Sequence, residues 1–162
     1  MAETKPTIIL VPGAFHKALH YYKLAMYLTM AGYIVSVIDL PSTTSEEPLV
    51  PVYENDVSTI SEAIRGFTEV GRDVVLVMHS YAGNPGTQAA CDFSPKQVGN
   101  SGETADVQSG AVIKLIYLAA WLPTERQELF SLPWPADFES FSVPDEKVRS
   151  SHLEDCPLQV MY

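Results

Sequence analysis

The chain has 162 residues, of which 46% are hydrophobic and 19% are charged. This length suffices for one domain with a sizeable core but not for two, and the composition excludes a disordered or membrane-embedded class. The 20 acidic and 10 basic residues give a formal net charge of -10, which disfavours nucleic acid and anionic lipid as partners.

Cysteine content and the N-terminus indicate the compartment. Two cysteines, Cys91 and Cys156, are too few for a disulfide framework or a zinc cluster, and neither lies in a CxxC spacing. The simplest interpretation is a reducing compartment. Glu3 and the lack of a small-residue cleavage site argue against a signal peptide, and no apolar run approaches a membrane span. We therefore expect a cytoplasmic protein with no membrane partner and no bound metal.

The first 41 residues predict two strands and a helix. The apolar run Thr7–Val11 is typical of a strand buried on both faces. Apolar residues at helical spacing predict an amphipathic helix over Ala18–Ala31, with Gly32 as its C-cap. Tyr33–Leu40 predicts a second strand, which Pro41 and a polar turn close.

The alternation of helix and strand continues to residue 118. A second amphipathic helix is predicted over Tyr53–Phe67, a third buried strand over Asp73–Met78, and a helix of small residues ends near Cys91. Phe93–Gly110 is polar and predicts a solvated loop insertion, and Val112–Leu118 predicts a fourth strand. The fold class expected is α/β, an open, mostly parallel sheet of about four strands with flanking helices.

A lone serine stands where the third strand meets small residues, in "VLVMHSYAGNPG". A serine hydroxyl is a useful nucleophile when a tight strand-to-helix turn lifts it clear of the sheet, a base is offered, and backbone N–H groups hold the oxyanion. Ala82 and Gly83 are small enough for strand and helix to approach. Met78 and Ala82 replace the two glycines of the GxSxG pattern, so the motif alone is moderately specific. Ser80 is the candidate nucleophile.

A glycine-containing loop follows the first strand and supplies candidate oxyanion donors. We expect the N–H groups of Ala14 and Tyr81 to form the oxyanion hole, and Gly13, Phe15 and His16 to lie in the same binding loop. Because the two loops follow strands expected to be adjacent, they should meet where ligands of open α/β sheets bind. The alternative is that the Pro-Gly pair merely turns the chain.

Four segments in order resemble the blocks of an α/β-hydrolase: "IILVPGAFH", "AGYIVSVIDLPS", "DVVLVMHSYAGNPG" and "VIKLIYLAAWLP". The branch they resemble includes plant methylesterases, hydroxynitrile lyases and uncharacterised fungal hydrolases. This resemblance implies a cofactor-free fold in which the elbow serine attacks an ester or related carbonyl. It also implies a partial hydrolase core over residues 1–123 and an irregular tail over 124–162, the remnant of a cap region.

The family's acid and base follow two further strands that this sequence does not predict, so the resemblance implies C-terminal truncation. His152 is the one histidine after Ser80, and it is a weak candidate for the base. Its alternative interpretation is a surface histidine in a loose tail. We expect His79 to be a packed or hydrogen-bonded residue and Asp39 a solvated turn residue, although Asp39 is also a candidate for the missing acid.

Three functions remain open from the sequence. The first is a serine hydrolase or esterase acting on a small ester or lactone, in specialised metabolism as the resemblance implies. The second is a truncated, catalytically degenerate homologue that persists as a small-molecule binder or partner subunit. The third is a cofactor-free lyase or cyclase using the same pocket. Because the strand Val112–Leu118 would form an apolar sheet edge, we also expect self-association through that edge.

Overall fold

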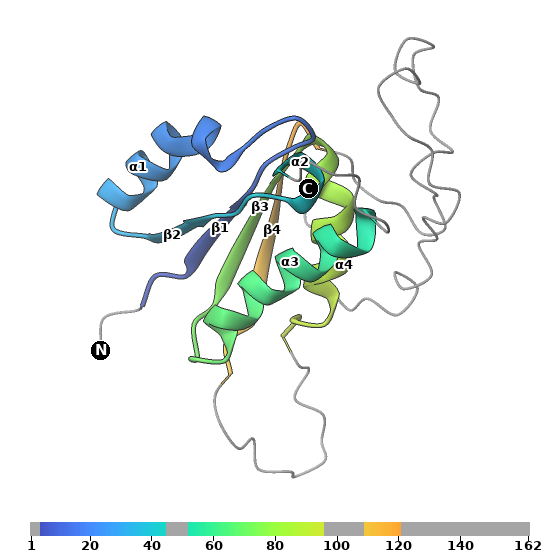
Figure 1. Cartoon of the computed structure of the whole chain (residues 1–162). Helices are drawn as coiled ribbons and strands as arrows, with labels where there is room; N and C mark the ends of the chain where they lie inside the picture. Colours follow the sequence, from blue (N-terminus) through green and yellow to red (C-terminus); the bar gives the residue numbers. More distant parts are fainter. Residues whose placement is uncertain (1–3, 45–51, 96–108, 121–162) are drawn as a thin grey trace.

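The computed structural model describes residues 4–44, 52–95 and 109–120 (Figure 1). In these segments strands and helices alternate as the sequence predicts. From the N-terminus the elements are β1 (Thr7–Val11), η1 (Ala18–Tyr21), α1 (Tyr22–Met30), β2 (Ile34–Val37), α2 (Pro41–Thr44), α3 (Val52–Thr68), β3 (Val74–His79), η2 (Ser80–Ala82), α4 (Gly83–Cys91) and β4 (Val112–Leu118). The elements η1 and η2 are short 3₁₀ helices.

All four strands form one parallel sheet in the order β2-β1-β3-β4. Parallel neighbours require crossover connections, and the helices supply them. The predicted fold class, an open parallel α/β sheet with flanking helices, is confirmed. Strands β1 and β3 are neighbours, with Val11 at the end of β1 opposite Met78 near the end of β3. The loops that follow these two strands therefore meet at the carboxyl ends of the central strands.

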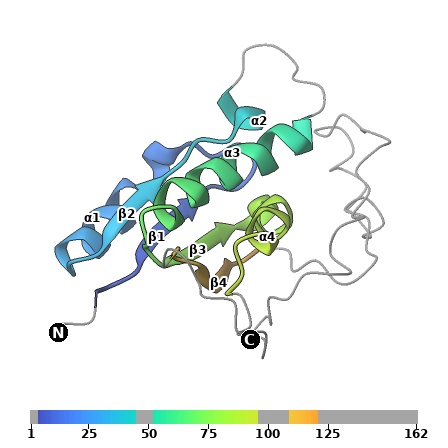
Figure 2. The same ribbon diagram turned by 90° about the horizontal axis from the view of Figure 1, so that it is seen from below.

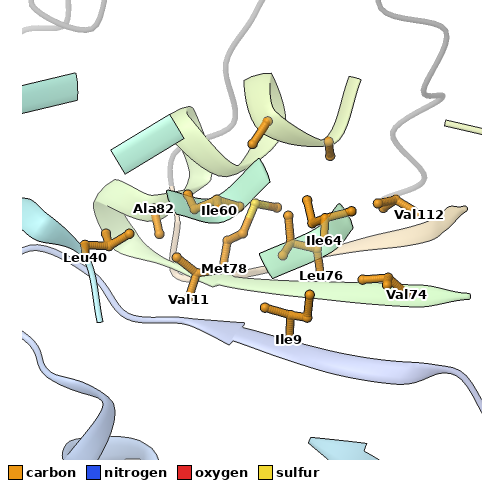
Figure 3. Close-up of a cluster of buried hydrophobic side chains, with 12 residues drawn as sticks. Ile9, Val11, Leu40, Ile60, Ile64, Val74, Leu76, Met78, Ala82 and Val112 are labelled. Carbon is orange, nitrogen blue, oxygen red and sulfur yellow. The ribbon is translucent and has the colours of Figure 1, made fainter. Parts of the chain in front are cut away.

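Helices cover both faces of the sheet (Figure 2). Alternate residues of a strand face opposite sides, so β1 contributes Ile9 and Val11 to one buried cluster and Ile8 and Leu10 to the other. The first cluster packs beneath α3 and α4 and is drawn in Figure 3. The second packs beneath α1. Burial on both faces explains why the strand sequences are continuous apolar runs rather than alternating ones.

The end of α1 follows the predicted glycine cap. Gly32 has a φ of 83°, a left-handed conformation that costs glycine little because it has no Cβ. The N–H of Tyr33 donates to the carbonyl of Leu28 at 3.1 Å, and the N–H of Gly32 donates to that of Thr29 at 2.9 Å. This pair of bonds is a Schellman motif. It ends the helix and directs the chain into β2.

Two predictions for the region after α1 are corrected. The second strand is shorter than the predicted Tyr33–Leu40, because only Ile34–Val37 pairs with β1. The predicted polar turn begins instead with the short helix α2, whose first residue is Pro41. Proline is favoured at the first position of a helix because its missing N–H would have no partner there.

The compartment argument drawn from the cysteines is also corrected. Cys91, the last residue of α4, is disulfide-bonded, which does not fit the reducing compartment expected from the two cysteines. Because disulfides persist in oxidising compartments, the cysteines no longer favour a reducing one. Within the described residues, no helix is both long and apolar enough to cross a membrane.

Several predictions lie outside the described residues. The irregular tail over 124–162, with its cap interpretation and His152, is one of them, and so is most of the predicted loop insertion over Phe93–Gly110. The two ends of that insertion are described. Phe93 packs against the core cluster of α3 and α4, and its carbonyl accepts the N–H of Val112 at 2.7 Å.

Candidate functional site

Ser80 lies at the junction predicted for it, between β3 and the helices η2 and α4. Its backbone is left-handed, with a φ of 52°. For a residue with a Cβ this conformation costs roughly 1 to 2 kcal/mol, and it persists only where the surrounding structure fixes it. Such a strained serine on a sharp strand-to-helix turn has the geometry of a nucleophile elbow.

Close packing between β3 and α4 explains how the elbow tolerates Met78 in place of a glycine. The Met78 side chain is fully buried beneath α4. A Cβ on Gly86 would overlap the Met78 sulfur and lie 2.9 Å from its Cγ. The space for the methionine is therefore created by a glycine on the facing helix. In this chain the small residue required for close approach is found six positions after the serine rather than two positions before it.

The loop after β1 packs directly against the elbow. A Cβ placed on Gly13 would lie 2.9 Å from the Cβ of Ser80 and 2.7 Å from Nδ1 of His79. The loop turns tightly, because the His16 N–H donates to the Gly13 carbonyl at 3.1 Å and Phe15 has a φ of 63°. The structure thus brings together Gly13, Ser80 and the loop that contains Ala14.

One predicted oxyanion donor is in the loop after β1, where Gly13 packs against Ser80, and the other is in η2, which begins at Ser80. Among the described residues no hydrogen-bond acceptor is found for the N–H of Ala14. Tyr81 is in the first turn of η2, where N–H groups have no intrahelical partner. The two amides therefore belong to the two chain segments that follow the neighbouring strands β1 and β3.

An aromatic and histidine cluster forms one wall next to the elbow. The Tyr21 hydroxyl and Nδ1 of His79 are 2.7 Å apart, and the rings of His79 and His16 meet edge to face at 5.1 Å. His16 in turn contacts the Ala14 carbonyl through Nδ1 at 2.9 Å, and its ring is 5.5 Å from that of the exposed His20. The expectation that His79 is a hydrogen-bonded residue is confirmed.

The protonation states of His79 and Tyr21 in this cluster follow from burial. Burial, followed by the charge of His16, lowers the pKa of His79, so the neutral ring is favoured at pH 7. Burial raises the pKa of Tyr21, and a backbone hydrogen bond from Gly13 opposes this shift. The Tyr21 hydroxyl therefore stays protonated at neutral pH. Tyr21 occupies an apolar position of the helix predicted over Ala18–Ala31, so the sequence pattern does not indicate this contact.

A buried carboxylate, Asp56 of α3, was also missed. It is 0% exposed. Its Oδ2 accepts from the Tyr81 hydroxyl at 2.9 Å, and its Oδ1 accepts from the Ser42 N–H at 3.0 Å. Burial raises its pKa, against the hydrogen bonds from Ser42 and Tyr81, which favour the ionised form. The available signal was an acidic residue within the apolar face of an amphipathic helix, next to Val57 and one turn before Ile60.

Within residues 4–44, 52–95 and 109–120, no general base or acid is hydrogen-bonded to Ser80. No histidine nitrogen or carboxylate oxygen there is hydrogen-bonded to the Ser80 hydroxyl. Asp39 is exposed and its Oδ1 accepts the Ala18 N–H at 2.6 Å, consistent with a solvated turn residue. In this part of the chain no group of three or more His, Cys, Asp or Glu side chains could hold a metal ion.

Known proteins are similar to this chain in sequence. The alpha/beta hydrolase nvfD of Aspergillus novofumigatus is 40% identical over 116 residues, covering 72% of this chain and 43% of that protein. An Arabidopsis thaliana relative, for which its name proposes methylesterase activity, is 26% identical over 96% of this chain and 56% of its own length. The chain therefore spans about half the length of these relatives.

Solved structures share the fold at lower identity. An extracellular alpha/beta-hydrolase from a Paenibacillus species superposes with a TM-score of 0.61 at 16% identity, covering 85% of this chain and 50% of that one. A methylesterase from Arabidopsis superposes with a TM-score of 0.55 at 22% identity, covering 80% and 52%. Residues 8–156 match the family described as "Alpha/beta hydrolase family". The chain belongs to the alpha/beta hydrolase family.

Proposed function

We propose that this chain carries the nucleophile and oxyanion hole of a serine hydrolase that acts on a small ester or lactone. Ser80 is the nucleophile, and the N–H groups of Ala14 and Tyr81 are the oxyanion donors. The observation that carries the proposal is the left-handed Ser80 at the end of β3, with Gly13 packed against its Cβ. A strained serine facing a glycine loop is the arrangement that acyl transfer requires.

The chemistry follows from these positions. The Ser80 hydroxyl oxygen attacks the substrate carbonyl, its proton passes to a general base, and the carbonyl oxygen becomes an oxyanion between the two amides. Removal of one such donor costs about 10²- to 10³-fold in rate in a well-studied serine protease. His152 remains the candidate base. His79 is less suitable, because its Nδ1 is already hydrogen-bonded to Tyr21.

The substrate class is proposed from the site and from the relatives together. An ester or lactone supplies a carbonyl for Ser80 without any cofactor. The names of two relatives refer to methylesterases, which supports an ester. The exposed ring of Phe15, 72% accessible in the loop next to the elbow, offers an apolar contact for a small organic acyl or alcohol group. A cytoplasmic location and a role in specialised metabolism also remain proposals.

A second function is favoured by one observation. Within the described segments no base is hydrogen-bonded to Ser80, which is also what a catalytically degenerate homologue would show. Such a protein would bind a small carbonyl compound at the same elbow without turning it over. The two functions differ in the reactivity of the Ser80 hydroxyl, because a binder does not require an activated nucleophile.

A fluorophosphonate probe separates the two functions. Attack by the serine oxygen forms a P–O bond and expels fluoride, so only an activated serine is labelled. We expect labelling of the purified chain, with the adduct located on Ser80 by mass spectrometry, and none of the Ser80→Ala variant. A His152→Gln variant tests the base. A folded wild-type chain that is not labelled would refute the hydrolase proposal and support the binder.

A further inference from the structure

Asp56 is a fully buried carboxylate at the carboxyl edge of the sheet, and the mechanism described above does not use it. Buried aspartates are rare unless they are paired or hydrogen-bonded. Asp56 has no accessible surface, and its two oxygens accept from different elements, the Ser42 N–H at the start of α2 and the Tyr81 hydroxyl in η2. One side chain on α3 thus connects α2, α3 and the elbow.

The hydrogen bond from Tyr81 acts on the residue that follows Ser80. Tyr81 is partly buried and packs against the core cluster that contains Val11, Met78 and Ala82. Burial raises the pKa of its hydroxyl, and the charge of Asp56 raises it further, so the hydroxyl stays protonated and donates. The Tyr81 hydroxyl and Oδ2 of Asp56 are 2.9 Å apart, within hydrogen-bonding distance. The Tyr81 side chain is therefore fixed at both its ring and its hydroxyl.

This anchoring bears on the strained serine. The left-handed φ of Ser80 persists only if the residues on both sides are held. On the N-terminal side β3 holds His79 in the sheet, where it pairs with Leu118 of β4. On the C-terminal side, the Tyr81 side chain is fixed by Asp56. Because the N–H of Tyr81 belongs to the Ser80–Tyr81 peptide, the same anchor sets where that donor points.

We propose that Asp56 is a positioning residue: its carboxylate holds Tyr81 and thereby aims the Tyr81 N–H at the oxyanion position. This role rests on the proposed function, because it presupposes that Ser80 reacts. Asp56 does not touch the substrate, and it acts through Tyr81. Its loss should therefore lower the rate of the chemical step and leave the affinity for a small probe unchanged.

The test compares four single variants and one double variant of the chain by fluorophosphonate labelling. Tyr81→Phe keeps the ring and removes the donor, Asp56→Ala removes the acceptor, and Asp56→Asn keeps one acceptor oxygen. Ile64→Val trims a fully buried side chain of the same helix, about 12 Å further along its axis, and serves as the matched packing control. The limiting labelling rate and the probe affinity are measured separately, below the unfolding temperature of every variant.

If Asp56 positions the donor, Tyr81→Phe and Asp56→Ala each lower the limiting rate by about 10- to 100-fold at unchanged affinity. The limiting labelling rate of Asp56→Asn should lie between the rates of these two variants and that of the wild type. Ile64→Val should be labelled as fast as the wild type. The double variant Tyr81→Phe/Asp56→Ala should be no slower than the slower single variant, because both changes break one connection.

Two results would overturn the role of Asp56 and are distinguishable from each other. Wild-type labelling at Ser80, with Tyr81→Phe and Asp56→Ala as fast as Ile64→Val, refutes the positioning role and leaves the hydrolase proposal standing. A wild-type chain whose labelling does not depend on Ser80 refutes the hydrolase proposal and, with it, the positioning role. If Asp56→Ala is unfolded, Tyr81→Phe, which keeps the packed ring, decides by the same criteria.

Discussion

Replacement of Gly13 by alanine should move the loop after β1, which contains Ala14, away from Ser80. The new Cβ would lie 2.7 Å from Nδ1 of His79, 2.9 Å from the Cβ of Ser80 and 3.0 Å from the His79 carbonyl oxygen. The first two distances fall short of the 3.4 Å of ordinary contact by about 0.5 to 0.7 Å. Since β3 holds the elbow backbone, the loop is the part that must move.

The size of the effect follows from that displacement. A misplacement of about 1 Å costs on the order of 100-fold in rate, so we expect Gly13→Ala to reduce the limiting fluorophosphonate labelling rate by about 10- to 100-fold. Overpacking of this kind typically also costs about 1 to 3 kcal/mol of stability. Both quantities are measured on the same preparation, the first by timed labelling and the second by urea denaturation.

Gly66→Ala is the matched control for this substitution. Gly66 lies in α3, is exposed, and has nothing within 4 Å of an added Cβ. Alanine there should stabilise the helix by about 0.5 to 1 kcal/mol and leave labelling unchanged. A Gly13→Ala chain that is folded and labelled at the wild-type rate would show that the loop does not contribute to the site, and the reasoning from the close contact would fail.

Three further predictions concern the pH dependence, the elbow packing and the sheet edge. The folded chain resists protonation of His79, whose pKa is lowered from 6.5, so the free energy of unfolding should fall as the pH drops below about 6.5. Urea denaturation at pH 7.5 and 5.5 measures this fall, and His79→Gln should make it smaller. An equal fall in the variant and the wild type would contradict the prediction. Gly86→Ala should destabilise the chain by about 1 to 3 kcal/mol because its Cβ would overlap the buried Met78; Met78→Val in the same chain should recover part of that loss, and no recovery would mean that the contact is not the cause. If β4 mediates self-association through its exposed Ile116 and Leu118, Ile116→Lys should reduce the molar mass that light scattering measures. A wild-type chain that is monomeric would exclude self-association through β4.

The sequence predicted the strands and helices around the candidate site, because these elements depend on local patterns. Continuous apolar runs identified all four described strands, and the glycine after α1 marked the end of that helix. The adjacency of the loops after β1 and β3 followed from the alternation of strands and helices. Ser80 is the predicted nucleophile because a lone hydroxyl stands between a buried strand and small residues, a feature visible along the chain.

The partners of the elbow residues could not be predicted, because they come from distant parts of the chain. Tyr21 and His79 are 58 positions apart, and Asp56 and Tyr81 are 25 apart. The packing of η1 and α3 on opposite faces of the sheet brings Tyr21 and Asp56 to the elbow. The compensation between Met78 and Gly86 was missed for a related reason. A pattern written along the strand does not show which helix residue lies above it.

The central claim is that Ser80 attacks a carbonyl whose oxygen is held by Ala14 and Tyr81. The most direct measurement is a crystal structure of the chain after reaction with a small alkyl fluorophosphonate. The account predicts a covalent bond to the Ser80 oxygen and a phosphonyl oxygen about 2.7 to 3.1 Å from both amide nitrogens. A phosphonyl oxygen that points away from both amides, or an adduct on another residue, would contradict it.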